Sequence, residues 1–219
     1  YVRCACQLYT VLVQHESGRD FLRFDRRGAL IKEIVAELEK TVNEGPHGSP
    51  MFSPTALTQS MAREYFTVIG AISETDLGRE MLAETHLSEL LQRIGAMPEL
   101  DYICRFVLTH LDYSEQGFFS RNLIEMWMSN GSRNLRLYGT CVLRALLRSH
   151  VAEFEDWGID VLLNQLHFAE PEVVRAALSV LEEASTNDLY LRCIVEKRPN
   201  LVKYKEASPL LQRFASCEP

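Results

Sequence analysis

The sequence predicts an all-α protein built as a stacked helical solenoid of the armadillo or HEAT kind. Three observations favour this class: apolar residues recur at helical spacing along most of the chain, the breaks between helices are mostly about two to six residues long, and a short motif recurs. A helix pair of this kind cannot bury its apolar face alone, so neighbouring pairs must cover it. A single closed helical bundle is the competing architecture.

The helices can be placed in order from their apolar spacing and their capping residues. Residues 1–13 trace a helical face, although their Val, Thr and Tyr content also suits a strand. In residues 30–44, apolar and charged side chains occupy opposite sides, as in an amphipathic helix. Ser53 and Pro54 are typical of a helix start, and the apolar spacing continues this helix through Ile72.

The rest of the chain continues the pattern with short breaks. Ser114 and Ser132 are suited to cap the helices that follow them, and Gly131 ends the helix before it. Pro171 suits a first helical turn, whereas Pro199 ends or interrupts the segment before it. The expected helices are 76–84, 86–94, 99–110, 118–128, 133–150, 158–168, 171–185 and 188–196.

Residues 43–54 break the helical pattern. They contain three Pro and two Gly in twelve positions, a composition typical of a loop. Helices of the same character flank this segment on both sides, so it does not mark a domain boundary. We predict an exposed, mobile loop within one solenoid segment that spans residues 1–219.

A faint repeat supports this architecture. Residues 18–22, Gly-Arg-Asp-Phe-Leu, recur 60 positions later as Gly-Arg-Glu-Met-Leu at 78–82, and each copy precedes an amphipathic segment. Residues 157–163, Trp-Gly-Ile-Asp-Val-Leu-Leu, are a looser third copy. Degenerate self-similarity between helix pairs is typical of a solenoid.

Length and charge restrict the class of protein. The chain has 219 residues, 47% of them hydrophobic, and can therefore bury a sizeable core. Its net charge of −7 has the wrong sign for a protein that binds nucleic acid mainly through phosphates. No apolar run approaches the roughly 18 residues of a membrane-spanning helix, and the first residues include neither a secretory signal nor an initiator Met. We interpret the chain as a piece of a longer, cytoplasmic protein.

The sequence offers little for catalysis or metal binding. Its six cysteines are scattered and include no Cys-x-x-Cys pair, so we expect reduced thiols, with Cys104 and Cys141 acting as small buried hydrophobes. Phosphate-binding loops, zinc-binding His pairs and nucleophile elbows are absent, and we expect no catalytic residues, no cofactor and no metal. The aromatics expected in the core are Trp127, Trp157, Tyr65, Phe66, Tyr138 and Phe154.

A row of arginines is the candidate binding site. Arg136, Arg144 and Arg148 lie on one face of the expected helix, with Arg133 one turn earlier. These four residues, here called the arginine strip, are either solvated and paired with the acidic stretch at 153–160 or form a docking strip for an acidic partner. The second interpretation rests on the ability of Arg to bind carboxylates and phosphates through two parallel hydrogen bonds.

Several runs, taken in order, resemble one known family. They are Arg-Glu-Tyr-Phe-Thr-Val-Ile-Gly-Ala-Ile-Ser at 63–73, Leu-Thr-His-Leu-Asp-Tyr-Ser at 108–114, Arg-Leu-Tyr-Gly-Thr at 136–140 and Phe-Glu-Asp-Trp-Gly-Ile-Asp-Val-Leu-Leu-Asn-Gln-Leu at 154–166. From about Gly18 onward, their order and spacing resemble the central armadillo-like region of the Rictor, or pianissimo, family. Residues 209–214 resemble the closing helix of that region.

The resemblance implies a non-catalytic scaffold of the rapamycin-insensitive TOR kinase complex, TOR complex 2. Its implied partners are proteins, namely the TOR kinase, a Sin-type adaptor and AGC-family kinase substrates, and any membrane association would be peripheral through the complex. The family motif supplies no catalytic residue and no role for the arginine strip. Two alternatives are a generic armadillo or HEAT adaptor unrelated to TOR and an all-α enzyme without a familiar motif.

Overall fold

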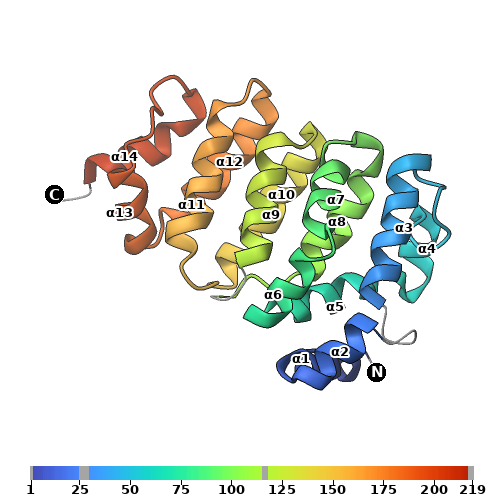
Figure 1. The fold of residues 1–219 in the computed structure, drawn as a ribbon. Helices are drawn as coiled ribbons and strands as arrows, with labels where there is room; N and C mark the ends of the chain where they lie inside the picture. The colour runs from blue at the N-terminus through green and yellow to red at the C-terminus, as the bar shows by residue number, and fades with distance from the viewer. Residues whose placement is uncertain (1, 25–29, 115–117, 217–219) are drawn as a thin grey trace. The chain divides into compact units, whose positions relative to one another are not determined.

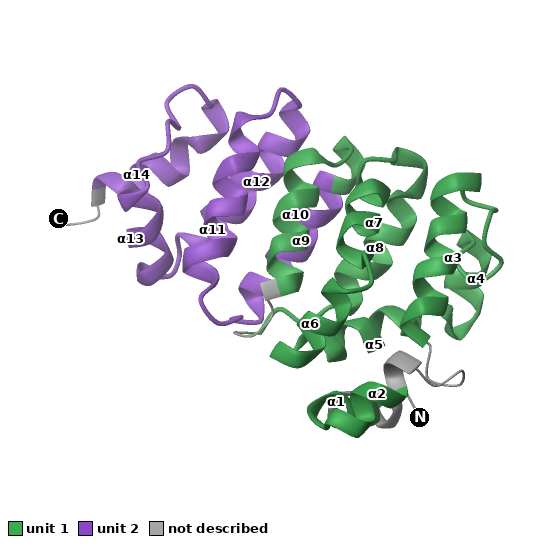
Figure 2. Cartoon of the chain, viewed as in Figure 1, with its two compact units in different colours: residues 1–135 green, residues 136–219 purple. Residues whose placement is uncertain are grey.

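A computed structural model of the chain describes residues 2–24, 30–114 and 118–216. Within these ranges the chain is built from α-helices and short 3-10 helices and contains no strand (Figure 1). It divides into two compact units, residues 1–135 and 136–219 (Figure 2). The all-α class is therefore confirmed.

Unit 1 carries the helices up to the first turn of α10. Its helices pack on near neighbours and also on helices further along the chain: α1 packs on α2 and α5, α3 on α7, α5 on α6 and α8, and α7 on α8 and α9. The elements are α1 (Val2–Gln14), α2 (Glu16–Phe24), α3 (Leu30–Glu44), α4 (Pro54–Gln59), η1 (Met61–Arg63), α5 (Glu64–Ser73), α6 (Asp76–Ala83), α7 (Leu87–Gly95), η2 (Pro98–Leu100), α8 (Asp101–His110) and α9 (Phe118–Asn130).

Unit 2 follows the same principle. Here α11 packs on α12 and α13, and α12 packs on α14 and the short helix before it, η4. Such packing between successive helices is solenoid-like, as the sequence predicts. The elements are α10 (Arg133–Arg148), α11 (Phe154–Asn164), η3 (Gln165–His167), α12 (Pro171–Ala184), α13 (Asp188–Glu196), η4 (Lys205–Ala207) and α14 (Ser208–Ser216).

Large aromatic side chains occupy the core of each unit. In unit 1 the indole of Trp127 is 1% exposed and donates its N–H to the carbonyl of Leu91 at 3.0 Å, which joins α9 to α7. In unit 2 the fully buried ring of Phe154 packs edge-on against the ring of Tyr190, with 6.1 Å between the ring centres, and this contact joins α11 to α13. The expected burial of Trp127, Phe66 and Phe154 is confirmed, whereas Trp157, Tyr65 and Tyr138 are only partly buried.

The structure corrects two helix boundaries and adds one helix, α2. The single helix expected from Ser53 to Ile72 is divided into α4, η1 and α5, because Ser60 ends one piece and begins the next. Its hydroxyl donates to the carbonyl of Ala56 at 2.6 Å and accepts from the N–H of Ala62 at 3.1 Å. The helix expected at Gly158 begins at Phe154 instead, after the left-handed residue Glu153.

The segment at 43–54 differs from the exposed, mobile loop that the sequence predicts. Its first two residues end α3 and its last begins α4, and the turn between them is anchored to the unit. The buried hydroxyl of Ser49 donates to the carboxylate of Glu37 at 2.6 Å. Phe52 is fully buried, and its carbonyl accepts a hydrogen bond from Tyr102 at 2.9 Å. Side chains within the turn thus hold it in place.

Two further expectations concern single residues. Cys104 is fully buried, as expected, but Cys141 is exposed on α10, so its assignment to the core is wrong. The predicted cap at Ser132 is confirmed, since its hydroxyl accepts from the N–H of Leu135 at 3.1 Å. Ser114 lies beside 115–117, which are outside the described residues, and its hydroxyl donates to Asp112 at 2.5 Å.

The repeated Gly-Arg motif marks the same local structure twice in unit 1. A Cβ on Gly18 would lie 2.1 Å from the carbonyl oxygen of Leu12, and one on Gly78 would lie 1.9 Å from that of Ile72. The arginine after each glycine donates to a carbonyl six residues earlier, Arg19 at 3.2 Å and Arg79 at 2.9 Å. In both cases glycine allows one helix to begin directly against the end of the previous one.

The third copy is different. A Cβ on Gly158 would meet the ring of Phe154 at 2.4 Å rather than a backbone carbonyl. This glycine lies inside α11 and makes room for an aromatic side chain. The likeness at 157–163 therefore does not mark the same turn.

We expect Gly78→Ala to lower the free energy of unfolding of the chain by about 1–3 kcal/mol, because the added methyl group forces α5 and α6 apart. Urea denaturation measures this change. Glu80→Ala, at an exposed position of the same helix, is the matched control and should change stability by less than about 0.5 kcal/mol. Equal urea midpoints for Gly78→Ala and Glu80→Ala would contradict the close approach of Gly78 to the carbonyl of Ile72.

Candidate partner-binding surface

Three residues of the arginine strip lie on the face of α10 that packs against α12 in unit 2. Their exposure rises along the helix: the side chain of Arg136 is 12% exposed, that of Arg144 34% and that of Arg148 63%. Between them Thr140 is 2% exposed and Leu143 fully buried, so the strip borders the core. Arg133, the fourth residue of the strip, is exposed at the start of α10 and belongs to unit 1.

Arg136 is held by two contacts within unit 2. One nitrogen of its guanidinium donates to both carboxylate oxygens of Glu170, at 3.2 and 3.3 Å. Its guanidinium carbon also lies 3.8 Å from the centre of the Phe168 ring, a cation–π contact. Because the side chain is mostly buried, both contacts lie in a partly desolvated environment, where they are stronger than at an exposed site.

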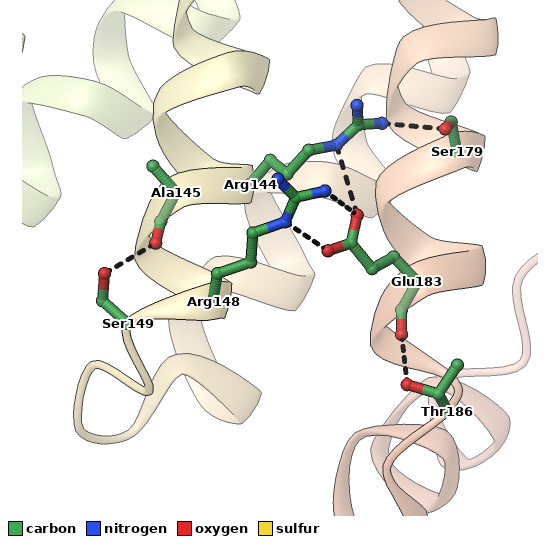
Figure 3. A network of polar contacts seen from close by, with 7 residues as sticks. All are labelled: Arg144, Ala145, Arg148, Ser149, Ser179, Glu183 and Thr186. Atoms are coloured by element: carbon green, nitrogen blue, oxygen red, sulfur yellow. Dashed lines mark hydrogen bonds and ion pairs between the residues drawn. The ribbon is translucent and has the colours of Figure 1, made fainter.

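Arg144 and Arg148 converge on one carboxylate of α12, that of Glu183 (Figure 3). Arg148 donates to both oxygens, with Nε at 2.5 Å from one and Nη2 at 3.0 Å from the other, which is the bidentate geometry that suits a guanidinium. Arg144 lies at 3.5 Å from the same carboxylate and donates to the hydroxyl of Ser179 at 2.8 Å. The two arginines thus share one acidic partner.

This geometry stabilises the charged forms of the pair. The hydrogen bond from Arg148 lowers the pKa of Glu183, and the positive charges of Arg148 and Arg144 add to this effect. The same hydrogen bond raises the pKa of Arg148. Both side chains are solvent-accessible, so water screens the pair and its contribution to stability is small.

For Arg136, Arg144 and Arg148, the expected pairing with residues 153–160 is wrong. Arg136 instead pairs with Glu170, and Arg144 and Arg148 pair with Glu183, so the carboxylates lie 34 to 39 positions further along the chain, on or next to α12. Within the acidic stretch, Asp160 accepts from Lys197 at 2.6 Å and raises the pKa of that lysine. Helical spacing identifies the strip, but it contains no information on which later helix packs against it. The docking role of the strip stays a prediction.

The described residues, 2–24, 30–114 and 118–216, form neither a metal-ligand cluster nor a membrane-spanning helix. Within them, no group of three or more His, Cys, Asp or Glu side chains is placed to hold a metal ion. None of the helices described is both long and apolar enough to cross a membrane.

Two protein-family models match the chain, one after the other. The first is described as "Rapamycin-insensitive companion of mTOR, middle domain" and covers residues 42–147. The second is described as "Rapamycin-insensitive companion of mTOR RasGEF_N domain" and covers residues 153–219. The chain belongs to the Rictor family. The resemblance in sequence is therefore confirmed.

Rictor-family relatives from distant organisms align with nearly all of the chain. Protein pianissimo A of Dictyostelium discoideum is 33% identical over 99% of the chain, which corresponds to 20% of that protein. Rapamycin-insensitive companion of mTOR of Homo sapiens is 29% identical over 96% of the chain and 12% of its own length. Target of rapamycin complex 2 subunit ste20 of Schizosaccharomyces pombe is 26% identical over 98% of the chain and 16% of its own length. The chain thus spans a fifth or less of these relatives.

The arginine contacts connect the two segments that the Rictor-family models match. Arg136 and Arg144 lie in the part matched by the middle-domain model, whereas Glu170 and Glu183 lie in the part matched by the RasGEF_N model. In the structure all four residues belong to unit 2. The strip therefore contributes to the packing of one matched segment on the other.

We expect the Glu183 carboxylate to stabilise the fold at neutral pH and to lose this effect in acid. Its pKa in the folded chain lies below the ordinary value of 4.5, so its contribution is present above pH 4.5 and is lost as the pH falls through the folded-state pKa. In urea denaturation, Glu183→Gln should be less stable than the wild type at pH 7, and the difference should shrink below pH 4.5.

Glu182→Gln is the matched control, because it removes the same charge from the neighbouring position and leaves the one arginine contact of Glu182, from Arg213 to its backbone carbonyl, in place. Its difference from the wild type should be smaller at pH 7. A Glu183→Gln difference that does not change between neutral and acidic pH would contradict the assignment of the pair.

Proposed function

We propose that this chain is a non-catalytic segment of a scaffold subunit of TOR complex 2. In this role it helps to assemble the TOR kinase, a Sin-type adaptor and AGC-family kinase substrates. One observation carries the proposal: the alignment with Rictor-family relatives runs over 96–99% of the chain, and the name of one relative describes a subunit of that complex. The chain spans only part of these relatives, so the role of the whole protein is inferred.

The structure supports a scaffold role in two ways. The described chain is all-helical, and successive helices cover one another, which leaves the outer helix faces available to partners. The ion pairs of Arg136, Arg144 and Arg148 fix the relative position of α10 and α12 and do not converge on a pocket with a reactive group. Binding through a rigid helical surface is the typical activity of such folds.

We also propose a cytoplasmic location, with membrane association only through the parent complex. Cys104, Cys141 and Cys193 are free thiols, a state that a reducing compartment maintains.

The experiment that tests the proposed function is affinity capture of the intact protein from its own cells, followed by identification of the proteins that co-purify in near-stoichiometric amounts. We expect a TOR-type kinase and its adaptor, and neither should appear in a capture from cells with the untagged protein. Reproducible absence of the kinase, with other proteins in its place, would leave the generic helical adaptor as the function.

We further propose that the exposed end of the arginine strip in unit 2, Arg148, contacts an acidic partner. Glu183 would then compete with the partner for Arg148. Because of this competition, Arg148→Gln should reduce partner capture, whereas Glu183→Gln should increase it, by a factor of about 2–10 in each case.

The measurement is the amount of each partner captured with the two variants, alongside their unfolding temperatures. A purely structural role predicts that both variants reduce capture, since both break the same ion pair. Changes in the same direction would therefore contradict docking at the strip.

A further inference from the structure

A pocket in unit 2 carries positive charge that the contacts described above do not use. It has a volume of about 540 Å³ and lies between the end of α11 with η3 and the chain that follows α13. Lys197, Arg198 and Lys203 line one side, and Asp160 and His167 lie on the other. This volume falls in the usual range for small-ligand and side-chain pockets.

The walls of the pocket are fastened to each other. The ion pair between Lys197 and Asp160, at 2.6 Å, joins the chain after α13 to α11. The hydroxyl of Tyr204 donates to the carbonyl of Leu166 in η3 and makes a second connection. Leu201, between these two points, is fully buried and anchors the segment. The pocket is therefore formed before a ligand arrives, which reduces the entropic cost of binding.

The residues that line the pocket include more cations than carboxylates. Three cations and one carboxylate leave its lining with a net charge of +2 when His167 is neutral. Asp160 neutralises Lys197, whereas Arg198 and Lys203 are exposed. The ammonium of Lys203 lies 4.9 Å from the Tyr204 ring, and within the described residues no carboxylate pairs with Lys203 or Arg198.

This situation differs from that of the arginine strip. Arg136, Arg144 and Arg148 already contact carboxylates of their own unit, so an incoming anion must displace Glu170 or Glu183. At Arg198 and Lys203 an anion gains two charge-assisted hydrogen bonds without breaking an ion pair. Recognition of a new anion is therefore favoured at the pocket over the strip.

We propose that this pocket binds a phosphorylated serine or threonine side chain of a protein partner. A phosphomonoester carries a charge of about −1.5 to −2 at pH 7, which matches the +2 of the lining, and it offers three acceptor oxygens to Arg198 and Lys203. The pocket is larger than a phosphate group, and Leu163, Leu166 and Pro199 provide apolar surface for a neighbouring side chain of the partner. The inference rests on the proposed function only in taking the partner to be a protein.

The test uses the intact protein and an array of peptides of diverse sequence, each present with phosphoserine and with serine. We expect a subset of peptides to bind at least about tenfold more strongly when phosphorylated. The double variant Arg198→Glu with Lys203→Glu should lose this preference. Arg192→Glu with Lys205→Glu is the matched control, because it changes the charge of unit 2 equally at exposed positions outside the pocket and should retain the preference.

The unfolding temperatures of both double variants show whether a loss comes from unfolding, and a pocket variant that unfolds is replaced by Arg198→Gln alone. The proposal is wrong if phosphorylation gives no preference, or if the control variant loses the preference to the same extent. It is also wrong if inositol hexakisphosphate or phosphatidylserine vesicles bind through Arg198 and Lys203 while the phosphopeptides do not. Because the array needs no TOR kinase, failure here leaves the co-purification test of the proposed function unaffected.

Discussion

Each unit of this chain depends on burial of apolar helix faces against neighbouring helices. Trp127 and Phe154 show the principle, since each is almost fully buried only because a second helix covers it. Loss of such a ring typically costs about 3–5 kcal/mol, more than the polar contacts at the surface contribute. Packing of helices against one another is thus required for stability. The polar contacts form only once this packing has brought the helices together.

The polar contacts between helices determine how the paired helices align. The indole N–H of Trp127 has its partner in a backbone carbonyl of α7, so a shift of α9 along α7 would leave a buried donor unpaired. Arg136 restrains α10 against α12 in the same way, through Glu170 and the ring of Phe168. Neither contact adds much stability alone, but each excludes alternative alignments in which a polar group loses its partner. A binding surface built from several helices needs this precision.

Much of the fold could be predicted from local sequence, because the information is local. The spacing of apolar residues placed α3 at Leu30–Glu44, and the cap at Ser132 marked the start of α10. Ser60 was missed because a serine within an apolar periodicity does not reveal whether its hydroxyl bonds only to its own helix or also begins the next one. Cys141 was misplaced because its apolar neighbours do not define which face of α10 is covered.

The candidate sites depend on information that is not local. Helical spacing grouped the arginines correctly, but their carboxylate partners lie 34 to 39 residues away, and the packing of α10 on α12 decides the pairing. The cationic pocket had no clear signal in the sequence, since Lys203 is separated from the adjacent Lys197 and Arg198 by four uncharged residues. These cations line one pocket only because η3 and the end of α11 form its opposite wall.

In an acidic chain most cations can find a carboxylate, and the arginines of α10 have done so. A periodic row of arginines is conspicuous in the sequence, yet three of its members form ion pairs within the folded chain. Arg198 and Lys203, which form no periodic pattern, make no ion pair with a carboxylate among the described residues, since Asp160 in the same pocket pairs with Lys197. Binding of an external anion therefore depends on the cationic side chains that form no ion pair within the folded chain. A partner-binding surface is better sought among those side chains than among cations that recur at regular spacing in the sequence.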